Sequence, residues 1–419
     1  LYGLLNSVGA APDAGPQFKL LARSLQAIRS HLGMEIAFIS QFVDGQAVMR
    51  EVDAPGSDAS IKVGDATPIE ETYCHYVLEG KLPNVIRDTT GEPIARSLAV
   101  TEDLPVGAYI GVPIRKGDDE VYGMLCCLSS QADLTLNSRD LQTMRVFADL
   151  AAYEINREID ANAAEKTVTT QINAVIREGL FSVVYQPIFN LEAGRPVGLE
   201  CLSRFADADT RSPASWFSDA DKVGLGAALE LAAMRRGLAA LPHLPDDVHL
   251  TVNASPLTIL SSELRAILDS VPAERIVLEV TEHASVTSYP NLLAALAPLR
   301  KAGVRLAVDD AGAGYAGLQH ILHLQPDLIK LDMSLTRHID VDRARRALTT
   351  ALIDFGHETG CRIVAEGVET ASELKTLKAL GVEKAQGYYL GRPMPLDDAV
   401  GLFAADNYPS IGETRRAAG

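Results

Sequence analysis

Cysteine is scarce in this sequence, and positive charge is outnumbered by negative charge. The five cysteines are scattered and form neither a Cys-x-x-Cys pair nor the Cys/His spacing of a zinc site. Free buried thiols in a reducing cytosol explain this set better than disulfides do, so we expect a cytoplasmic protein. The 38 basic side chains oppose 55 acidic ones, which gives a formal charge of −17. This composition excludes a broadly basic surface that would coat a nucleic-acid polymer.

Long apolar runs are also missing. No run reaches the roughly 18 residues that a membrane-spanning helix needs, and no signal peptide is visible, so no membrane contact is expected within this chain. The chain begins with Leu1 instead of Met, which leaves open whether an upstream segment was removed. A length of 419 residues predicts two or three domains, and 47% apolar with 22% charged residues is typical of globular proteins.

The first 150 or so residues predict one antiparallel sheet with helices packed on it. Apolar residues from Phe18 to Leu32 recur at helical spacing, and Asp44-Gly45 is typical of a tight turn between two strands. Strands are expected at residues 34–42, 48–52, 108–114 and 121–128. This pattern favours an α+β domain.

A long helical stretch follows. Asn137 or Ser138 can cap its start, and an apolar stripe continues at three- and four-residue steps to Ile176, past a small polar segment at 163–165. A helix between two domains with one apolar stripe can pair with its twin in a dimer. The alternative, which the sequence leaves open, is a helix packed on its own domain.

From about residue 181, short apolar strands alternate with helices. Eight strands are expected, at residues 183–185, 197–202, 248–252, 276–280, 305–308, 328–331, 363–365 and 384–386. Alternating βα units over this length favour a closed barrel or a doubly wound sheet. No Gly-rich dinucleotide fingerprint follows any of these strands, which weakens the doubly wound alternative.

Polar residues gather toward the ends of these strands. One lies within the second strand and the others end or follow later strands: Glu200, Asn253, Glu279, Asp309, Asp310, Lys330, Glu366 and Gln386. In a βα barrel the carboxyl ends of all strands open on one face, so these side chains are expected to converge. Five are carboxylates, and two unit charges about 4 Å apart repel by about 4 kcal/mol at an effective dielectric near 20. One lysine cannot offset this repulsion.

The repulsion predicts either protonated carboxylates or bound divalent cations. Carboxylate and amide oxygens favour Mg²⁺ or Mn²⁺ over Zn²⁺. The adjacent Asp309 and Asp310 can place one carboxylate between two ions. Two ions about 3.5–4 Å apart commonly assist the cleavage of a phosphodiester, so this chemistry is expected at the barrel mouth.

The same residues resemble a known family. The stretch Glu200-Cys201-Leu202-Ser203-Arg204 is similar to the Glu-Ala-Leu signature of EAL-domain phosphodiesterases, bacterial signalling enzymes that hydrolyse cyclic di-GMP. The resemblance covers residues 170–405 and includes, in order, Tyr185-Gln186-Pro187-Ile188, Val252-Asn253-Ala254-Ser255, Glu279-Val280-Thr281-Glu282, Asp309-Asp310-Ala311-Gly312, Lys330-Leu331-Asp332, Ala365-Glu366-Gly367-Val368-Glu369 and Gln386-Gly387-Tyr388. It implies a TIM-like (β/α)8 barrel, usually dimeric, that converts cyclic di-GMP to linear 5′-pGpG.

The resemblance also implies a role for each matching residue. The ligands of one metal ion would be Glu200, Asn253, Glu279 and Asp309, and those of a second would be Asp309, Asp310 and Glu366. Lys330 would hold and polarise the attacking water, and Glu366 is a candidate base. The substrate contacts would be Gln186 and Arg204, with Gln386 supporting the same cluster. Glu282 and Glu369 would steady the loop after Asp310.

Two positions depart from the family pattern. Cys201 replaces the middle Ala of the signature, and its side chain should point away from Glu200 along the strand. Ala311 replaces the common Phe after the Asp pair, which could loosen a ligand-bearing loop and lower the rate. Neither change removes a ligand.

The N-terminal half resembles a GAF sensory domain. The resemblance rests on Thr72-Tyr73-Cys74-His75-Tyr76-Val77, Val85-Ile86-Arg87-Asp88-Thr89, Tyr109-Ile110-Gly111-Val112-Pro113-Ile114 and Tyr122-Gly123-Met124-Leu125. Such domains hold a small molecule or only dimerise, and the sequence does not name a ligand. Cys74-His75 lies too early for the bilin attachment of related domains, and Cys126-Cys127 is expected in the core.

These observations predict a GAF-like domain at residues 1–157, a helical linker at 158–172, an EAL domain at 173–410 and a tail at 411–419. The expected protein is a homodimer, paired through the EAL domain and the connecting helix, that hydrolyses cyclic di-GMP with Mg²⁺ or Mn²⁺ under GAF control. No Gly-Gly-Asp/Glu-Glu-Phe signature for synthesis is present. The alternatives are a weak or silent cyclic di-GMP receptor and a phosphodiesterase for another ester.

Overall fold

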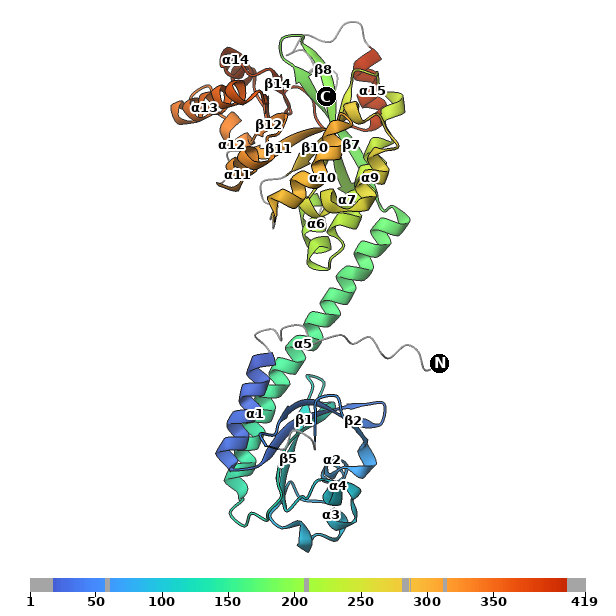
Figure 1. Ribbon diagram of the computed structural model, residues 1–419, viewed down its shortest axis with the longest axis vertical. Helices are drawn as coiled ribbons and strands as arrows, with labels where there is room; N and C mark the ends of the chain where they lie inside the picture. Colours follow the sequence, from blue (N-terminus) through green and yellow to red (C-terminus); the bar gives the residue numbers. More distant parts are fainter. Residues whose placement is uncertain are drawn as a thin grey trace. The chain divides into compact units, whose positions relative to one another are not determined.

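The computed structural model describes residues 18–56, 61–206, 211–280, 286, 288–311 and 315–404. The chain divides into two compact units, Leu1–Ala164 and Glu165–Gly419 (Figure 1). Helix α5 (Ser138–Glu178) begins in the first unit and ends in the second without interruption. The polar segment at 163–165 therefore lies inside one helix.

The first unit is built on a six-stranded sheet in the order β3-β2-β1-β6-β5-β4, antiparallel at every pairing. Its strands are β1 (Ile36–Val43), β2 (Gln46–Asp53), β3 (Ala66–Pro68), β4 (Val85–Ile86), β5 (Ala108–Arg115) and β6 (Val121–Ser129). Asp44 and Gly45 both adopt positive φ between β1 and β2, which confirms the tight turn. The short β3 and β4 carry too little pattern to be expected from sequence.

Helices cover both faces of this sheet. Helix α1 (Phe18–Leu32) and the first part of α5 bury one face, with Leu25 and Met144 in that core. The short helices α2 (Tyr73–Leu78), α3 (Pro93–Ser97) and α4 (Ala99–Asp103) cover the other face. Because side chains alternate along β6, neighbouring residues of that strand belong to different cores.

The second unit is a closed eight-stranded barrel. Its strands are β7 (Phe181–Asn190), β8 (Arg195–Phe205), β9 (His249–Asn253), β10 (Ile276–Val280), β11 (Arg305–Ala311), β12 (Leu328–Leu331), β13 (Arg362–Ala365) and β14 (Lys384–Ala385). The helices around it are α6 (Pro213–Lys222), α7 (Gly226–Leu238), α8 (Pro256–Leu260), α9 (Ser262–Leu268), α10 (Tyr289–Lys301), α11 (Tyr315–Leu324), α12 (Met333–Thr336), α13 (Arg343–Thr359), α14 (Ala371–Ala379) and α15 (Leu396–Ala404). The expected barrel is confirmed.

One strand corrects the expectation that all carboxyl ends open on one face. Strand β7 pairs antiparallel with both of its neighbours, β8 and β14. Only residues 191–194 join β7 to β8, and so short a connection can form a hairpin but not a crossover. The other strands are parallel to one another, so the convergence of their ends is kept. Among the described helices, none is both long and apolar enough to cross a bilayer.

Candidate active site

Acidic side chains from separate strands surround one lysine inside the barrel. Lys330 on β12 is 2% exposed and Glu279 on β10 is fully buried. Lys330 Nζ lies 2.7 Å from Glu366 Oε1 and 2.9 Å from Glu279 Oε1. It also lies 3.2 Å from Asp309 Oδ1 and 3.6 Å from Glu200 Oε2. The predicted convergence of these five residues is therefore present in the fold.

The pKa values of the clustered residues are shifted by burial and by the repulsion among the carboxylates. Burial raises the pKa of Glu279 well above its ordinary range, with Glu200, Asp309 and Glu366 adding to the effect and Lys330 opposing it. Burial likewise raises the pKa of Glu366. Burial alone would lower the pKa of Lys330, but the four carboxylates outweigh it and raise that pKa well above its usual value. One ammonium is shared among four acids, so positive charge is in deficit.

The Asp pair sits at an irregularity of β11. The pairing of β11 with β12 shifts register between Val308 and Ala311, and Asp310 adopts a positive φ of 56°. The Asp310 N–H donates to Asp309 Oδ1 at 3.0 Å. This local turn brings two consecutive carboxylates to the same side, whereas a regular strand would point them to opposite faces.

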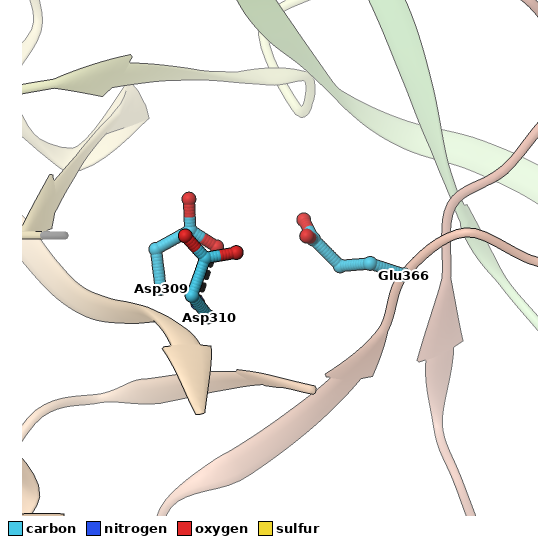
Figure 2. A group of neighbouring side chains, drawn as sticks. All are labelled: Asp309, Asp310 and Glu366. Carbon is cyan, nitrogen blue, oxygen red and sulfur yellow. Dashed lines mark hydrogen bonds between the residues drawn. The ribbon is translucent and has the colours of Figure 1, made fainter. Parts of the chain in front are cut away.

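Three carboxylates are close enough to share a cation. Figure 2 shows Asp309 and Asp310 side by side, with Glu366 pointing toward them from the segment after β13. One oxygen from each of these residues lies within 4.8 Å of the others. Among the described residues, both Glu279 oxygens lack an aligned hydrogen-bond donor, although Lys330 is near. Buried carboxylate oxygens without donors fit a bound hard cation.

Amide side chains complete the interior wall. Gln386 Nε2 donates to Gln186 Oε1 at 3.0 Å and also to Glu200 Oε2. Gln186 Nε2 in turn donates to the Gly391 carbonyl at 3.1 Å. These hydrogen bonds link β7, β8 and the segment after β14, so the reversed strand still delivers its predicted side chain to the cluster.

A cavity of about 630 Å³ adjoins the acidic cluster. Its lining includes Arg204, Asn253 and Asp310, and its far wall comes from α6 and α7. The Arg204 guanidinium donates to the Ser203 carbonyl at 2.8 Å, with Nη1 as the donor. The volume is typical of small-molecule sites, and the combination of an arginine with nearby carboxylates suits an anion held beside a cation.

Of the two residues predicted to steady the loop after Asp310, the structure describes one, Glu369. Glu369 forms an ion pair with Arg337 in the described structure. Glu373 accepts the backbone N–H groups of Glu369 and Thr370 at 3.0 and 2.9 Å, which holds the segment after Glu366. Glu282 lies outside the residues that the structure describes.

Sequence reasoning missed Glu230. This residue of α7 lines the cavity, accepts the Ser255 N–H at 2.8 Å and accepts the Thr258 hydroxyl at 2.5 Å. Burial raises its pKa. Glu230 thereby fixes Ser255, the N-cap of α8, which lies two residues after Asn253. The only sequence signal for Glu230 was that it is the single acid in a helix rich in Ala and Leu. That signal is weak, because Glu230 does not follow the end of a strand.

Comparison with known sequences identifies the barrel. The sequence model of the EAL domain matches residues 169–393, more than half of the chain. The chain belongs to the EAL domain family. The sequence model of the GAF domain matches residues 19–155, which confirms the predicted two-domain organisation of GAF followed by EAL. The matched EAL segment contains all of the clustered residues.

Two curated relatives carry names that describe an activity. The probable cyclic di-GMP phosphodiesterase PdeG of Escherichia coli is 30% identical over 270 residues, which cover 62% of this chain and 53% of the relative. The cyclic di-GMP phosphodiesterase PA2567 of Pseudomonas aeruginosa is 31% identical over 238 residues, which cover 54% and 40%. The chain spans about half or less of the length of these relatives.

A solved structure resembles most of the chain. The EAL enzyme Bd1971, in its cGMP-bound form, aligns with a TM-score of 0.55 at 18% sequence identity. The alignment covers 89% of this chain and 93% of that chain. At this identity the likeness supports the fold alone.

Proposed function

We propose that this protein hydrolyses cyclic di-GMP to linear 5′-pGpG at the acidic mouth of its EAL barrel. The observation that carries the proposal is the set of four carboxylates within 3.6 Å of the buried Lys330 ammonium. The names of the relatives PdeG and PA2567 support the choice of substrate. The adjoining cavity offers room for a nucleotide.

Two divalent cations, Mg²⁺ or Mn²⁺, fit this set of oxygen ligands. We assign one cation to Glu200, Asn253, Glu279 and Asp309, and the second to Asp309, Asp310 and Glu366. When bound, such cations supply Lewis-acid stabilisation of the charge that develops on the phosphate oxygens. The raised carboxyl pKa values and the donor-free oxygens of Glu279 support this assignment.

The chain's own groups would orient and deprotonate the attacking water. Lys330 Nζ can donate a hydrogen bond to that water while it holds Glu366 Oε1 at 2.7 Å. A carboxylate with a raised pKa is suited to accept the proton, which assigns Glu366 as general base. Arg204 is positioned on the cavity wall to bind a phosphate oxygen. Gln186 and Gln386 would orient the same region of the substrate.

We also assign the functional state to a homodimer paired through the barrel and α5, with the GAF unit regulating the barrel. Support comes from exposed apolar side chains on one stripe of α5: Val146, Leu150 and Tyr153 are 67%, 39% and 63% exposed. Their spacing of four and three residues is that of a coiled-coil seam.

Turnover of cyclic di-GMP tests the activity. The wild-type chain with Mg²⁺ or Mn²⁺ should release linear dinucleotide, and Glu200→Ala should abolish the release. Glu192→Ala, which removes an exposed carboxylate on the β7–β8 hairpin, is the matched control and should keep wild-type turnover. Tight binding without turnover by the wild type would instead establish a silent receptor, the alternative that the Ala311 substitution favours. Turnover of a different phosphate ester alone would refute the substrate assignment.

A further inference from the structure

A second buried polar cluster lies in the first unit, away from the barrel. Cys74 on α2 and Cys126 on β6 are 3% and 0% exposed, and their Sγ atoms lie 3.8 Å apart. The two residues are 52 positions apart in the sequence and belong to different elements. The contact therefore joins the helical cover of the sheet directly to the sheet.

A buried tyrosine hydroxyl contacts one of these thiols. The Tyr109 hydroxyl lies 3.2 Å from Cys126 Sγ. It occupies the space above Gly111, where a β-carbon would come within 2.1 Å of it. A glycine and a buried tyrosine are thus arranged so that a polar group meets the thiols inside an otherwise apolar core.

The environment makes the two thiols unequal. Hydrogen bonding with the Cys126 thiol lowers the pKa of Cys74 despite its burial. Burial raises the pKa of Cys126 well above its usual value. A thiol with a lowered pKa is the better nucleophile, because the thiolate is the reacting form.

Cys127 provides an internal contrast. It follows Cys126 directly in β6, so its side chain points to the opposite face of the sheet. There it is fully buried beside Met144, with its Sγ 3.9 Å from the Met144 sulfur, and it belongs to the core beneath α1 and α5. Cys127 lies on the same strand as Cys126 and is equally buried, but the sulfur next to it belongs to the Met144 thioether, which cannot form a disulfide.

We propose that Cys74 and Cys126 form a redox-active dithiol, which closes to a disulfide when the protein meets hydrogen peroxide. The Cys74 thiolate attacks one peroxide oxygen, the O–O bond breaks, and the other oxygen leaves as water after taking a proton. Cys126 sulfur then attacks the sulfenic acid sulfur of Cys74 and releases the oxygen as a second water, which carries away the Cys126 proton. The two thiols lose two electrons in total, and the peroxide gains them.

Closure has a structural consequence within this unit. A disulfide requires the sulfur atoms to approach to about 2.0 Å, so α2 must move toward β6 or the side chains must turn. Tyr73 of α2 stacks on Tyr109, with ring centroids 5.0 Å apart. Oxidation should therefore displace the Tyr109 hydroxyl from Cys126 and alter the tyrosine environment. Peroxide is small enough to enter through a local opening of the short helix α2.

Peptide mapping of the full-length chain tests the proposal. The reduced protein is treated with hydrogen peroxide, quenched in acid, unfolded in an alkylating reagent and digested without reductant. We expect one cross-linked peptide pair that contains Cys74 and Cys126, a mass lower by two hydrogens, and full recovery of both thiols after dithiothreitol. Cys127→Ser should form the same cross-link to the wild-type extent, whereas Cys74→Ser and Cys126→Ser should not form it.

The decisive readout needs no variant, since it is made on the wild-type protein. Complete alkylation of Cys74 and Cys126 after peroxide treatment would overturn the proposal. So would pairing with Cys127, Cys201 or Cys361, or oxidation of Cys74 to a sulfinic acid without a cross-link. The oxidised chain should also show a higher unfolding temperature for the first unit, because a cross-link restricts the unfolded chain. The proposal does not depend on the activity of the barrel.

Discussion

The two ends of the barrel differ in the side chains that the strands carry: basic residues begin several strands, and acidic or amide residues end or follow the same strands. Besides β8, which begins with Arg195, four strands begin with a basic residue: His249 on β9, Arg305 on β11, Arg362 on β13 and Lys384 on β14. These strands end at, or lead into, the oxygen-bearing residues of the site: Asn253, Asp309, Glu366 and Gln386. Like charges lie close together at each end, so each end must resolve the same kind of repulsion.

The ends resolve it in different ways. At the acidic end, Lys330 pairs with four carboxylates and positive charge is still in deficit. At the basic end, none of the ion pairs formed among the described residues involves His249, Arg305, Arg362 or Lys384. Burial, followed by Arg305 and Arg362, lowers the pKa of Lys384 to about 8. Burial likewise lowers the pKa of His249 well below its usual value. Negative charge therefore stays in excess at the acidic end, whereas at the basic end burial and neighbouring positive charge weaken proton binding by His249 and Lys384.

The largest expected effect is on turnover, which should fall when a lysine is removed at the acidic end of the barrel but not at the basic end. Lys330→Met should lower turnover of cyclic di-GMP by about 10³-fold. The attacking water loses its hydrogen-bond donor, and four carboxylates lose the ammonium group that they share. Lys384→Met, at the other end of the barrel, should keep turnover close to wild type. Equal losses in both variants would show that the lysine at the acidic end acts only through stability.

The second test uses metal binding and the position of the chain's one tryptophan. Trp216 lies in α6, so its fluorescence reports unfolding of the barrel unit. Mg²⁺ at about 100 times its dissociation constant should stabilise the barrel by about 3 kcal/mol, since only the folded state gathers the ligands. Asp310→Asn should reduce this gain, and Glu192→Gln should not. A melting temperature that does not change when Mg²⁺, Mn²⁺ or a chelator is added would contradict the proposed cation site.

The third test concerns the pH dependence of the basic end. Lys384 has a folded pKa near 8, below its unfolded value, so its protonated form destabilises the fold. Between that pKa and about 10.4 the unfolded state binds more protons, and the contribution of Lys384 to stability must rise with pH. Lys384→Met should therefore stabilise the barrel by about 2 kcal/mol at pH 7, and the gain should shrink toward pH 10.

Urea unfolding followed by Trp216 fluorescence measures this difference. The matched control is Lys375→Met, which removes an exposed lysine of α14 and should change little at either pH. A destabilised Lys384→Met at pH 7 would mean that the ammonium has a partner whose attraction exceeds the burial penalty.

The acidic end was predictable from sequence, and the basic end was not. Strands 276–280 and 328–331 were placed at their observed bounds because buried parallel strands are short apolar runs. An acid directly after such a run is conspicuous. A lysine or arginine directly before an apolar strand is usually exposed to solvent and carries no signal. Only the closure of the barrel brings Arg305 close enough to Lys384 for their positive charges to repel. The same closure was needed to place Glu230 on the cavity wall.

The reversal of β7 has a similar explanation. Strands β7 and β8 are 10 and 11 residues long, much longer than predicted, because polar residues such as Ser182 and Arg204 continue the antiparallel pairing beyond the apolar core. The predicted strands stopped where the apolar run stopped. The direction of β7 followed from neither run, because the predicted strands left residues 186–196 between them, and this longer gap was taken as part of a βα repeat instead of as a hairpin.

The smallest expected effect concerns Cys201, which follows Glu200 directly but lies on the other face of β8. A β-carbon at Gly237 of α7 would come within 3.0 Å of Cys201 Sγ, so the thiol packs between the strand and this helix. Cys201→Ala should cost about 1 kcal/mol of barrel stability through a small cavity, measured by urea unfolding, and should leave turnover within about threefold of wild type. A tenfold loss of turnover at wild-type stability would instead place this thiol in contact with the substrate, because it also lines the adjoining cavity.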